Sequence, residues 1–471
     1  MTTTAVNTEP ISQAELDVAF PMFRGELVLP HEPAYEERRL IWNRLFDDVR
    51  PAVVARCSGT SDVQDVVNFA RETGHPLAIR GGGHSLAGKS TCQDGVVLDL
   101  SLMRHCWVDQ VRETIHVGGG ATWGDLDREA AAFGFVAPGG ALSITGVGGV
   151  TLGGGFGWLV RRFGLCLDNV VSMDVVTAAG KIVTCNEDRH ADLFWALRGG
   201  GGNFAVVTNF ELGLHRINPD ILTGVLGWPI EDAPDVLRFY GPIAPDFPRE
   251  IGLNAQLVVA PPMAEIPVEL HGKPILILIY AHHGDDHSIG AAAIDRLREY
   301  RAPAFDTTAL GTYLELQRSN DFRCLPGRSC WQTGYLDELG PAIEDIVAQF
   351  ADVPSAMCLS EFLTMSGAIS DVPEDATAFR RRDGWVYNVI TIWEGEKDDD
   401  LHLDWAHRYQ EAMLPYASDG AYINFFSAGE DHRVLEAYGP EKLARLRKIK
   451  RVYDPENLFR VNHNIEPAAV W

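Results

Sequence analysis

The chain has 471 residues, of which 46% are hydrophobic and 22% are charged, a composition typical of globular proteins with two or more domains. It contains 40 Lys and Arg against 65 Asp and Glu, which gives a formal net charge of −25 at pH 7. Because this charge repels nucleic acids and anionic membrane surfaces, we expect neither as a partner.

Targeting and metal-binding signals are weak in this sequence. Residues 1–17 contain no basic segment followed by an apolar run, and the longest apolar stretch, residues 275–280, is too short to cross a membrane. We therefore expect a cytoplasmic location and no membrane partner. The eight cysteines show neither a CxxC pair nor the spacing of zinc ligands, which predicts buried thiols and no metal.

A β-α-β unit is predicted in the first quarter of the chain. Residues 51–57 are typical of a strand, and the capping-box pattern at residues 61–64 opens a helix that Gly74 ends. Residues 76–80 form the second predicted strand. This strand carries the glycine run 81–83 to a strand end, which is where α/β folds bind their ligands.

Residues 83–90, GHSLAGKS, match the phosphate-loop pattern G-x-x-x-x-G-K-S/T. In nucleotide-triphosphate-binding proteins a helix follows this loop, because the helix N-terminus and its Ser or Thr hold phosphate and magnesium. Here residues 91–95 are typical of a turn and residues 96–100 of a strand. A nucleotide-triphosphate hydrolase is therefore kept only as an alternative.

Three further glycine-rich runs occupy residues 116–125, 137–158 and 196–210. None of them reads G-x-G-x-x-G before a predicted helix, so the dinucleotide-binding fingerprint is absent. Such a density of glycine predicts tight turns, close approach of the backbone to another group, and N–H groups exposed to an anion. We therefore favour a large cofactor over a loop-rich β-region without a ligand.

After residue 218 the glycine content falls, and strands alternate with helices. These changes divide the chain into a first domain at residues 1–218, a second domain at residues 219–417 and a C-terminal segment at residues 418–471. The elements expected in the last two parts are strands at residues 273–280 and 385–393 and helices at residues 288–300, 342–350 and 440–453.

Four segments together carry a resemblance to a known family: residues 76–85, residues 138–157, residues 192–204 (DLFWALRGGGGNF), and residues 453–465, which contain YDPENLF and NHNI. In this order they resemble the flavin-linked oxidases of the vanillyl-alcohol-oxidase type, in the branch of berberine-bridge-enzyme-like and 6-hydroxy-D-nicotine-oxidase-like proteins. The resemblance extends over nearly the whole chain. It implies an α+β protein with a two-domain PCMH-type FAD-binding fold and a substrate domain of antiparallel sheet covered by helices.

The resemblance implies FAD as a covalently bound cofactor. His84 matches the histidine that bonds to the flavin 8α-methyl group. Some members add a cysteine tether at the position of Leu142, so we expect His84 to be the single tether here. Thr145 stands where the family controls oxygen access, which leaves the electron acceptor open. The residues expected to bind FAD are His84, Arg80, Gly81, Gly82, Gly83, Ser85, Gly139, Gly140, Ser143, Thr145, Gly148, Gly149, Gly153, Val206, Asn462 and Asn464.

The catalytic base is where this chain departs from the family pattern. The family often places a tyrosine at the position of Phe425, which accepts no proton. Tyr422 replaces it only if its side chain faces the pocket, and strand alternation predicts opposite faces for residues 422 and 425. Asn388 stands where plant members have a glutamate, and an asparagine orients a substrate without acting as a base. The catalytic candidates are therefore Tyr422, Tyr387 and Asn388.

Other polar groups in the second half are expected to be structural or solvated. This holds for Glu361 and Asp371, and for the histidine-rich residues 282–287, which are interpreted as a solvated loop instead of a metal site. The arginines at residues 161–162 and 380–382 are possible contacts for an anionic substrate. In so acidic a chain we expect them to pair with neighbouring carboxylates.

These observations predict an FAD-dependent oxidoreductase that oxidises a C–OH, C–N or activated C–C bond of a small organic substrate. Hydride passes to flavin N5, and O2 is the expected acceptor, giving H2O2. Two alternatives stay open: a dehydrogenase that uses another acceptor, and a catalytically inert flavoprotein, which Phe425 and Asn388 motivate. The sequence names no substrate.

Overall fold

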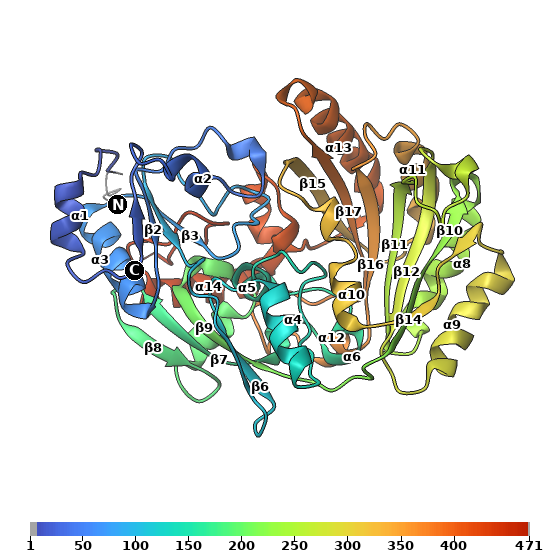
Figure 1. Ribbon diagram of the computed structural model, residues 1–471, viewed down its shortest axis with the longest axis horizontal. Helices are drawn as coiled ribbons and strands as arrows, with labels where there is room; N and C mark the ends of the chain where they lie inside the picture. Colours follow the sequence, from blue (N-terminus) through green and yellow to red (C-terminus); the bar gives the residue numbers. More distant parts are fainter. Residues whose placement is uncertain (1–6, 470–471) are drawn as a thin grey trace.

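The computed structural model describes residues 7–469, and its strands form three sheets (Figure 1). The two smaller sheets take their strands from residues 26–213, and the nine-stranded sheet takes them from residues 221–418. The C-terminal helix α14 (Val434–Tyr453), drawn in red, returns to the half that contains the smaller sheets. The predicted boundaries at residues 218 and 417 stay predictions. Within the described residues, no helix has both the length and the apolar character needed to cross a membrane.

The first sheet contains the predicted β-α-β unit. Its strand order is β1-β2-β4-β3, and both β2 and β3 run parallel to β4, which lies between them. Helix α3 packs its apolar side on this sheet and ends at Gly74, whose φ of 75° lies in the left-handed region that favours glycine. The elements are α1 (Gln13–Ala19), β1 (Glu26–Val28), α2 (Tyr35–Arg39), β2 (Val53–Arg56), α3 (Thr60–Thr73), β3 (Leu77–Arg80) and β4 (Val96–Asp99).

The predicted capping box at the start of α3 is wrong. Gly59 is the N-cap residue and Ser61 lies inside the helix. The start of the helix is instead held by Asp62, whose carboxylate accepts hydrogen bonds from the backbone N–H and the hydroxyl of Ser58, both at 2.8 Å. Asp62 thus ties the first turn to the segment before it, and the N–H groups of this turn have no side-chain cap.

The connection from β3 to β4 bears on the phosphate-loop alternative. Residues 81–95 join these parallel neighbours without any helix, as predicted. Lys89, which would have to reach a phosphate, forms an ion pair with Asp431 at 2.7 Å. In such proteins a helix N-terminus holds phosphate and magnesium, and residues 81–95 contain no helix. The structure therefore gives the hydrolase alternative no support.

The second sheet is antiparallel, with the strand order β5-β6-β9-β7-β8. Its core extends to α4 and to the C-terminal helix α14, so this sheet and the C-terminal end of the chain share one hydrophobic cluster. The elements of this part are β5 (Cys106–Asp109), β6 (Thr114–Gly118), α4 (Trp123–Ala132), α5 (Val147–Gly153), α6 (Val160–Phe163), β7 (Val170–Thr177), β8 (Ile182–Cys185), α7 (Ala191–Leu197) and β9 (Ala205–Gly213).

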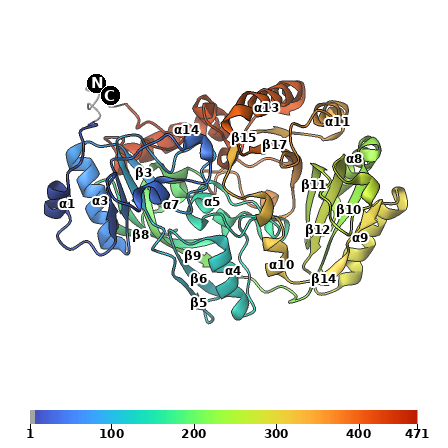
Figure 2. The same ribbon diagram turned by 45° about the horizontal axis from the view of Figure 1, so that its top comes forward.

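The third sheet confirms the predicted antiparallel sheet covered by helices (Figure 2). Helices α8 (Ala233–Ile243), α9 (His287–Tyr300), α11 (Ile343–Phe350) and α13 (Asp399–Met413) pack on one face. The other face lies toward the smaller sheets. The remaining elements are β10 (Ile221–Pro229), β11 (Ile251–Val259), β12 (Pro274–His282), β13 (Phe305–Asp306), β14 (Ala309–Gly311), α10 (Tyr313–Arg318), β15 (Arg328–Leu336), β16 (Leu359–Met365), α12 (Ala368–Asp371), β17 (Gly384–Trp393) and β18 (Ala417–Ser418).

A buried lysine anchors the C-terminal helix to the first half of the chain. Lys450 is fully buried, and its ammonium group donates to the carboxylate of Asp454 at 2.6 Å. It also donates to the carbonyls of Asn203 at 2.6 Å and Phe459 at 3.0 Å. The helix breaks at Gly439, so its second part begins at residue 440, as predicted.

Candidate active site

A cavity of about 380 Å³ is lined by both halves of the molecule. The loop after β3 and residues 140–158 form one wall, and strands β11, β15, β16 and β17 form the opposite wall. A second cavity of about 190 Å³ adjoins it. The residues that line both cavities are Ile79, Gly81, Gly149, Ile423, Asn424 and His463.

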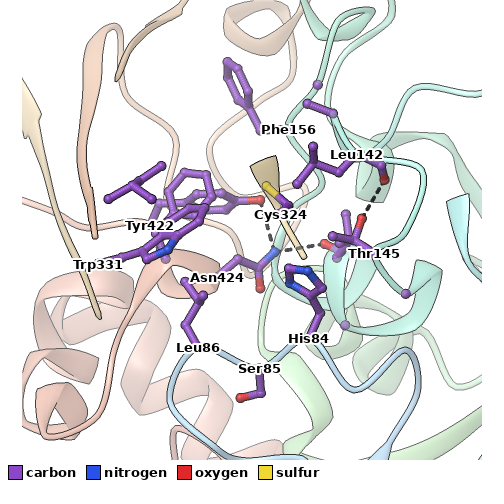
Figure 3. A pocket seen from close by; sticks show the side chains of 18 of the residues that line it. His84, Ser85, Leu86, Leu142, Thr145, Phe156, Cys324, Trp331, Tyr422 and Asn424 are labelled. Carbon is purple, nitrogen blue, oxygen red and sulfur yellow. Dashed lines mark hydrogen bonds between the residues drawn. The ribbon is translucent and has the colours of Figure 1, made fainter. Parts of the chain in front are cut away.

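His84 lies in the wall of the larger cavity, on the side of Thr145 and Leu142 (Figure 3). Its imidazole stacks on the indole of Trp42 with 4.2 Å between the ring centroids. The Nε2 atom is buried and has no hydrogen-bond partner among the described residues. Burial lowers the pKa of His84 to about 4, so the imidazole is neutral at pH 7 and Nε2 can carry a free lone pair.

Glycines shape the wall beside His84. A Cβ atom on Gly82 would lie 2.5 Å from the Cα of Gly146, so the two loops meet backbone to backbone. Gly83 has a φ of 69°, in the left-handed region. A Cβ atom on Gly149 would meet no atom within 4 Å, because this residue faces the cavity. Together with the unpartnered Nε2 of His84, this open and flat backbone fits a large cofactor such as FAD.

Most of the predicted cofactor residues line the two cavities. Their contact with FAD stays a prediction. The larger cavity is lined by Gly81, Gly82, Gly83, His84, Ser85, Gly140, Thr145 and Gly149, and the smaller one also by Gly148 and Gly153.

Arg80 and Val206 line neither cavity, in contrast to the prediction. The guanidinium of Arg80 is buried and donates to the backbone carbonyls of Arg38 at 2.5 Å and Arg39 at 3.1 Å. It therefore supports the loop from behind. Val206 points into the core, because side chains alternate along β9, and its neighbours Ala205 and Val207 line the smaller cavity.

Gly139 and Ser143 also lie behind the cavity wall. A Cβ atom on Gly139 would lie 1.9 Å from the ring of Trp123, so this glycine is needed for packing. The backbone N–H of Ser143 donates to the carboxylate of Asp321 at 3.0 Å, and its hydroxyl donates to the same group.

The two predicted asparagines near the C-terminal end flank the cavity without lining it. Asn462 donates to the carbonyl of Phe459 at 2.9 Å, and the side-chain oxygens of Asn462 and Asn464 are buried. The residue between them, His463, lines both cavities and was missed. The NHNI motif was the available signal for it, and the predicted contact of Asn462 and Asn464 with FAD stays a prediction.

Tyr422 and Phe425 lie together, and the predicted strand is wrong here. Residues Ile423–Phe425 form a 3₁₀ helix, in which positions three apart lie on the same side. The two rings are 4.6 Å apart, and both residues line the larger cavity. The hydroxyl of Tyr422 accepts hydrogen bonds from the N–H of Gly155 at 2.9 Å and from Asn424 at 3.1 Å (Figure 3). Burial raises the pKa of Tyr422 to about 12, so its phenol stays protonated at neutral pH.

The structure brings neither Tyr387 nor Asn388 to the cavity lining. Tyr387 points to the helix-covered face of β17, where its hydroxyl donates to Gln410 at 3.0 Å. Asn388 is fully buried, and its amide donates to one oxygen of Glu361 at 2.7 Å. Asn254 donates to the other oxygen at 3.0 Å. Asn388 therefore positions a carboxylate that itself lines the cavity.

Glu361 lines the larger cavity, whereas the sequence predicted a structural or solvated side chain. Among the described residues that line the larger cavity it is the one carboxylate. Burial raises its pKa above the usual 4.5, and the amide hydrogen bonds oppose this rise. A glutamate in the middle of the apolar strand LSEFLTM was the available signal, because such a strand rarely buries a charge without a partner or a function.

The two arginine groups and the histidine-rich residues 282–287 lie outside both cavities. Arg161 donates to backbone carbonyls, such as that of Ala244 at 2.9 Å, instead of pairing with a carboxylate, because the carbonyls at the end of α8 need donors. All eight cysteines are free and most are buried, as predicted. No cluster of three potential metal ligands occurs in residues 7–469. The ion pairs expected for the second arginine group are present: Arg380 with Asp419, Arg381 with Asp168 and Arg382 with Asp337.

Comparisons with known proteins agree with this arrangement. Residues 51–186 match the family described as FAD binding domain, and residues 421–466 match the family described as berberine and berberine like. The chain is 30% identical over 462 residues to (R)-6-hydroxynicotine oxidase of Paenarthrobacter nicotinovorans, covering 95% of this chain and 97% of that protein.

Solved structures show the same fold. The crystal structure of 6-hydroxy-D-nicotine oxidase from Arthrobacter nicotinovorans matches with a TM-score of 0.85 and 28% identity, over 95% of this chain and 98% of that one. BBE-like 1 from Physcomitrella patens matches with a TM-score of 0.83 and 22% identity, over 97% of this chain and 100% of that one. The predicted α+β fold of PCMH-type FAD-binding proteins is confirmed.

Proposed function

The chain belongs to the family of FAD-linked oxidoreductases that combine an FAD-binding domain with a berberine-like segment, and we propose that it holds FAD covalently through His84 alone. The observation that carries this proposal is the half-buried imidazole of His84 in the cavity wall, whose pKa burial lowers to about 4 and whose buried Nε2 atom has no partner in the described residues. Leu142, which also lines the cavity, has no group that bonds a flavin.

The proposed reaction is the oxidation of a C–OH, C–N or activated C–C bond of a small organic molecule. Bound FAD supplies the hydride acceptor, its N5 atom, and O2 is the proposed final acceptor, with H2O2 as product. The glycine loops around residues 81–83 and 146–149 would hold the cofactor, since their backbone borders the cavity. Apolar side chains such as Trp331 and Ile390 keep water away from the substrate.

We assign the role of proton acceptor to Glu361. When hydride leaves a carbon that bears a hydroxyl or an amine, the proton on the heteroatom needs a base. The carboxylate of Glu361 lines the cavity and is held by amide donors from Asn254 and Asn388 on the two neighbouring strands. Tyr422, whose phenol stays protonated, is assigned to binding and orienting.

Acid precipitation tests the covalent link. We expect the native protein to keep its yellow colour in the acid pellet and to show an intact mass raised by one FAD. His84→Ala removes the attachment atom, so its flavin should pass to the supernatant and its mass should equal that of the bare chain. His407→Ala, which changes an exposed histidine on α13, is the control and should behave as the native protein does. A native pellet without colour would overturn the covalent link.

Gly149→Ala is expected to bind less flavin without losing stability. The added methyl group meets no protein atom within 4 Å and enters the cavity, while alanine favours a helix over glycine by about 0.5–1 kcal/mol. The ratio of flavin to protein absorbance and the melting temperature measure the two effects. Gly340→Ala, where a methyl group also meets no atom but which lies outside both cavities, is the matched control. Equal flavin content in both variants would contradict the placement of the cofactor beside Gly149.

A further inference from the structure

Arg323 is a buried cation in the wall of the larger cavity. It ends the short 3₁₀ helix Asp321–Arg323, which connects α10 to β15. Only 9% of its surface is exposed, and it lines the cavity together with Glu361. The sequence interpretation did not single it out, because DFRCLPGRS has the composition of an ordinary loop.

The guanidinium of Arg323 has no counterion in the described part of the chain. Its Nε atom is buried without a hydrogen-bond partner, and no carboxylate among residues 7–469 acts on its pKa, which burial lowers. Three other arginine side chains with little exposure have partners: Arg381 pairs with Asp168, Arg433 pairs with Glu430 at 2.6 Å, and Arg161 donates to three backbone carbonyls. Because a buried charge without a partner is costly, an unpaired arginine facing a cavity indicates an anionic ligand.

The segment that carries Arg323 is held in place from both sides by residues of the first half. The carboxylate of Asp321 accepts a hydrogen bond from the N–H of Ser143 at 3.0 Å. The indole of Trp42, which stacks on His84, donates to the carbonyl of Cys324 at 2.7 Å. Cys324 and Leu142 both line the cavity (Figure 3). The backbone that carries Arg323 is therefore held in place relative to the first half of the chain before any ligand binds.

Two other basic side chains of the lining already have an acidic partner. Lys89 and His463 both contact the carboxylate of Asp431, at 2.7 Å and 2.9 Å. Arg323 is thus the one unpaired cation among the described lining residues, which suits a ligand with a single negative charge. Much of the remaining lining is apolar or aromatic, including Trp331 and Phe425, whose rings are 5.4 Å apart.

We propose that Arg323 binds the carboxylate of the substrate, so that the enzyme acts on organic acids with an apolar or aromatic body. The planar guanidinium fork matches a carboxylate, and a phosphate dianion would leave one charge unpaired in this apolar lining. The proposal rests on the proposed function, since it places the oxidisable carbon between Arg323 and Glu361. Arg323 would thus select substrates by binding their carboxylate, and Glu361 would accept the proton.

Binding of benzoate against benzamide, its neutral counterpart, tests the proposal in the flavin-loaded protein at neutral pH. Isothermal calorimetry and the perturbation of the visible flavin spectrum both measure the affinity. We expect benzoate to bind the native protein about 10- to 100-fold more tightly than benzamide. Arg323→Gln should remove this difference, and Arg323→Lys should keep part of it. Arg318→Gln, the same change at an exposed position on α10, should leave it unchanged.

Two results would overturn the proposal. Equal affinities of the native protein for benzoate and benzamide would do so without the need for any variant. Arg323→Gln could also lose its bound flavin and still prefer benzoate to benzamide in calorimetry. That result would assign the arginine to cofactor binding instead. A colourless native protein would contradict the proposed function, and calorimetry would still show whether Arg323 binds the carboxylate. The two proposals therefore fail separately.

Discussion

Glu361→Gln is expected to lower kcat by about 10²- to 10⁴-fold while the bound flavin stays unchanged. The amide keeps the shape of the side chain and its place between Asn254 and Asn388, but it accepts no proton. Steady-state turnover of an alcohol or amine that bleaches the native flavin measures the effect. The flavin absorbance of each preparation shows that the cofactor is still bound.

The pH profile gives the same assignment a second test. Glu361 acts as a base only when it is ionised, and burial raises its pKa above 4.5. Activity should therefore fall as the pH drops through that raised pKa, so the acid limb lies above pH 4.5, and Glu361→Gln should lose this limb. Asp371→Asn is the matched control, because Asp371 is exposed and pairs with Arg249 outside the cavity. Full activity in Glu361→Gln would assign the base elsewhere.

Lys450→Met is expected to lower the free energy of unfolding by about 3–5 kcal/mol. The ammonium group of Lys450 is fully buried and neutralises Asp454, which is also fully buried. Methionine fills a similar volume but leaves this carboxylate with only its two backbone N–H donors and no cation, and it leaves the carbonyls of Asn203 and Phe459 without the ammonium donor. Chemical denaturation followed by tryptophan fluorescence measures the loss.

The control for this variant lies on the same helix. Lys448 is exposed, so Lys448→Met should change the free energy of unfolding by no more than about 0.5 kcal/mol. If the two variants unfold at the same denaturant concentration, the buried ion pair does not anchor the C-terminal helix as described.

Local features of the fold were predictable from the sequence because they depend on neighbouring residues. The strand before the glycine run, the stop of α3 at Gly74 and the turn between β3 and β4 each rest on a few adjacent side chains. The prediction failed where a competing local geometry was available. At the start of α3, Asp62 binds the preceding Ser58 and no serine caps the helix, and at residues 423–425 the chain turns in a 3₁₀ helix.

The candidate site also contains residues that were predictable from the sequence and residues that were not. The residues around His84 were predictable because their motif is contiguous in the sequence. Glu361 and Arg323 were not, because their place depends on pairing between distant strands and on a loop held by Trp42, hundreds of residues earlier. Tyr387 lies on the helix-covered face of β17 because side chains alternate along this strand, and no local pattern reveals which face a residue takes.

The contact of Trp42 with both His84 and Cys324 imposes an order on maturation. Residues 42 and 84 leave the ribosome long before residue 324 is synthesised. Until the later half closes over it, the imidazole of His84 stays in water and keeps its ordinary basicity. Under the proposed attachment, the flavin bond therefore forms only on chains that have completed folding. The amount of flavin that stays attached after denaturation then gives the number of molecules that have reached the native state.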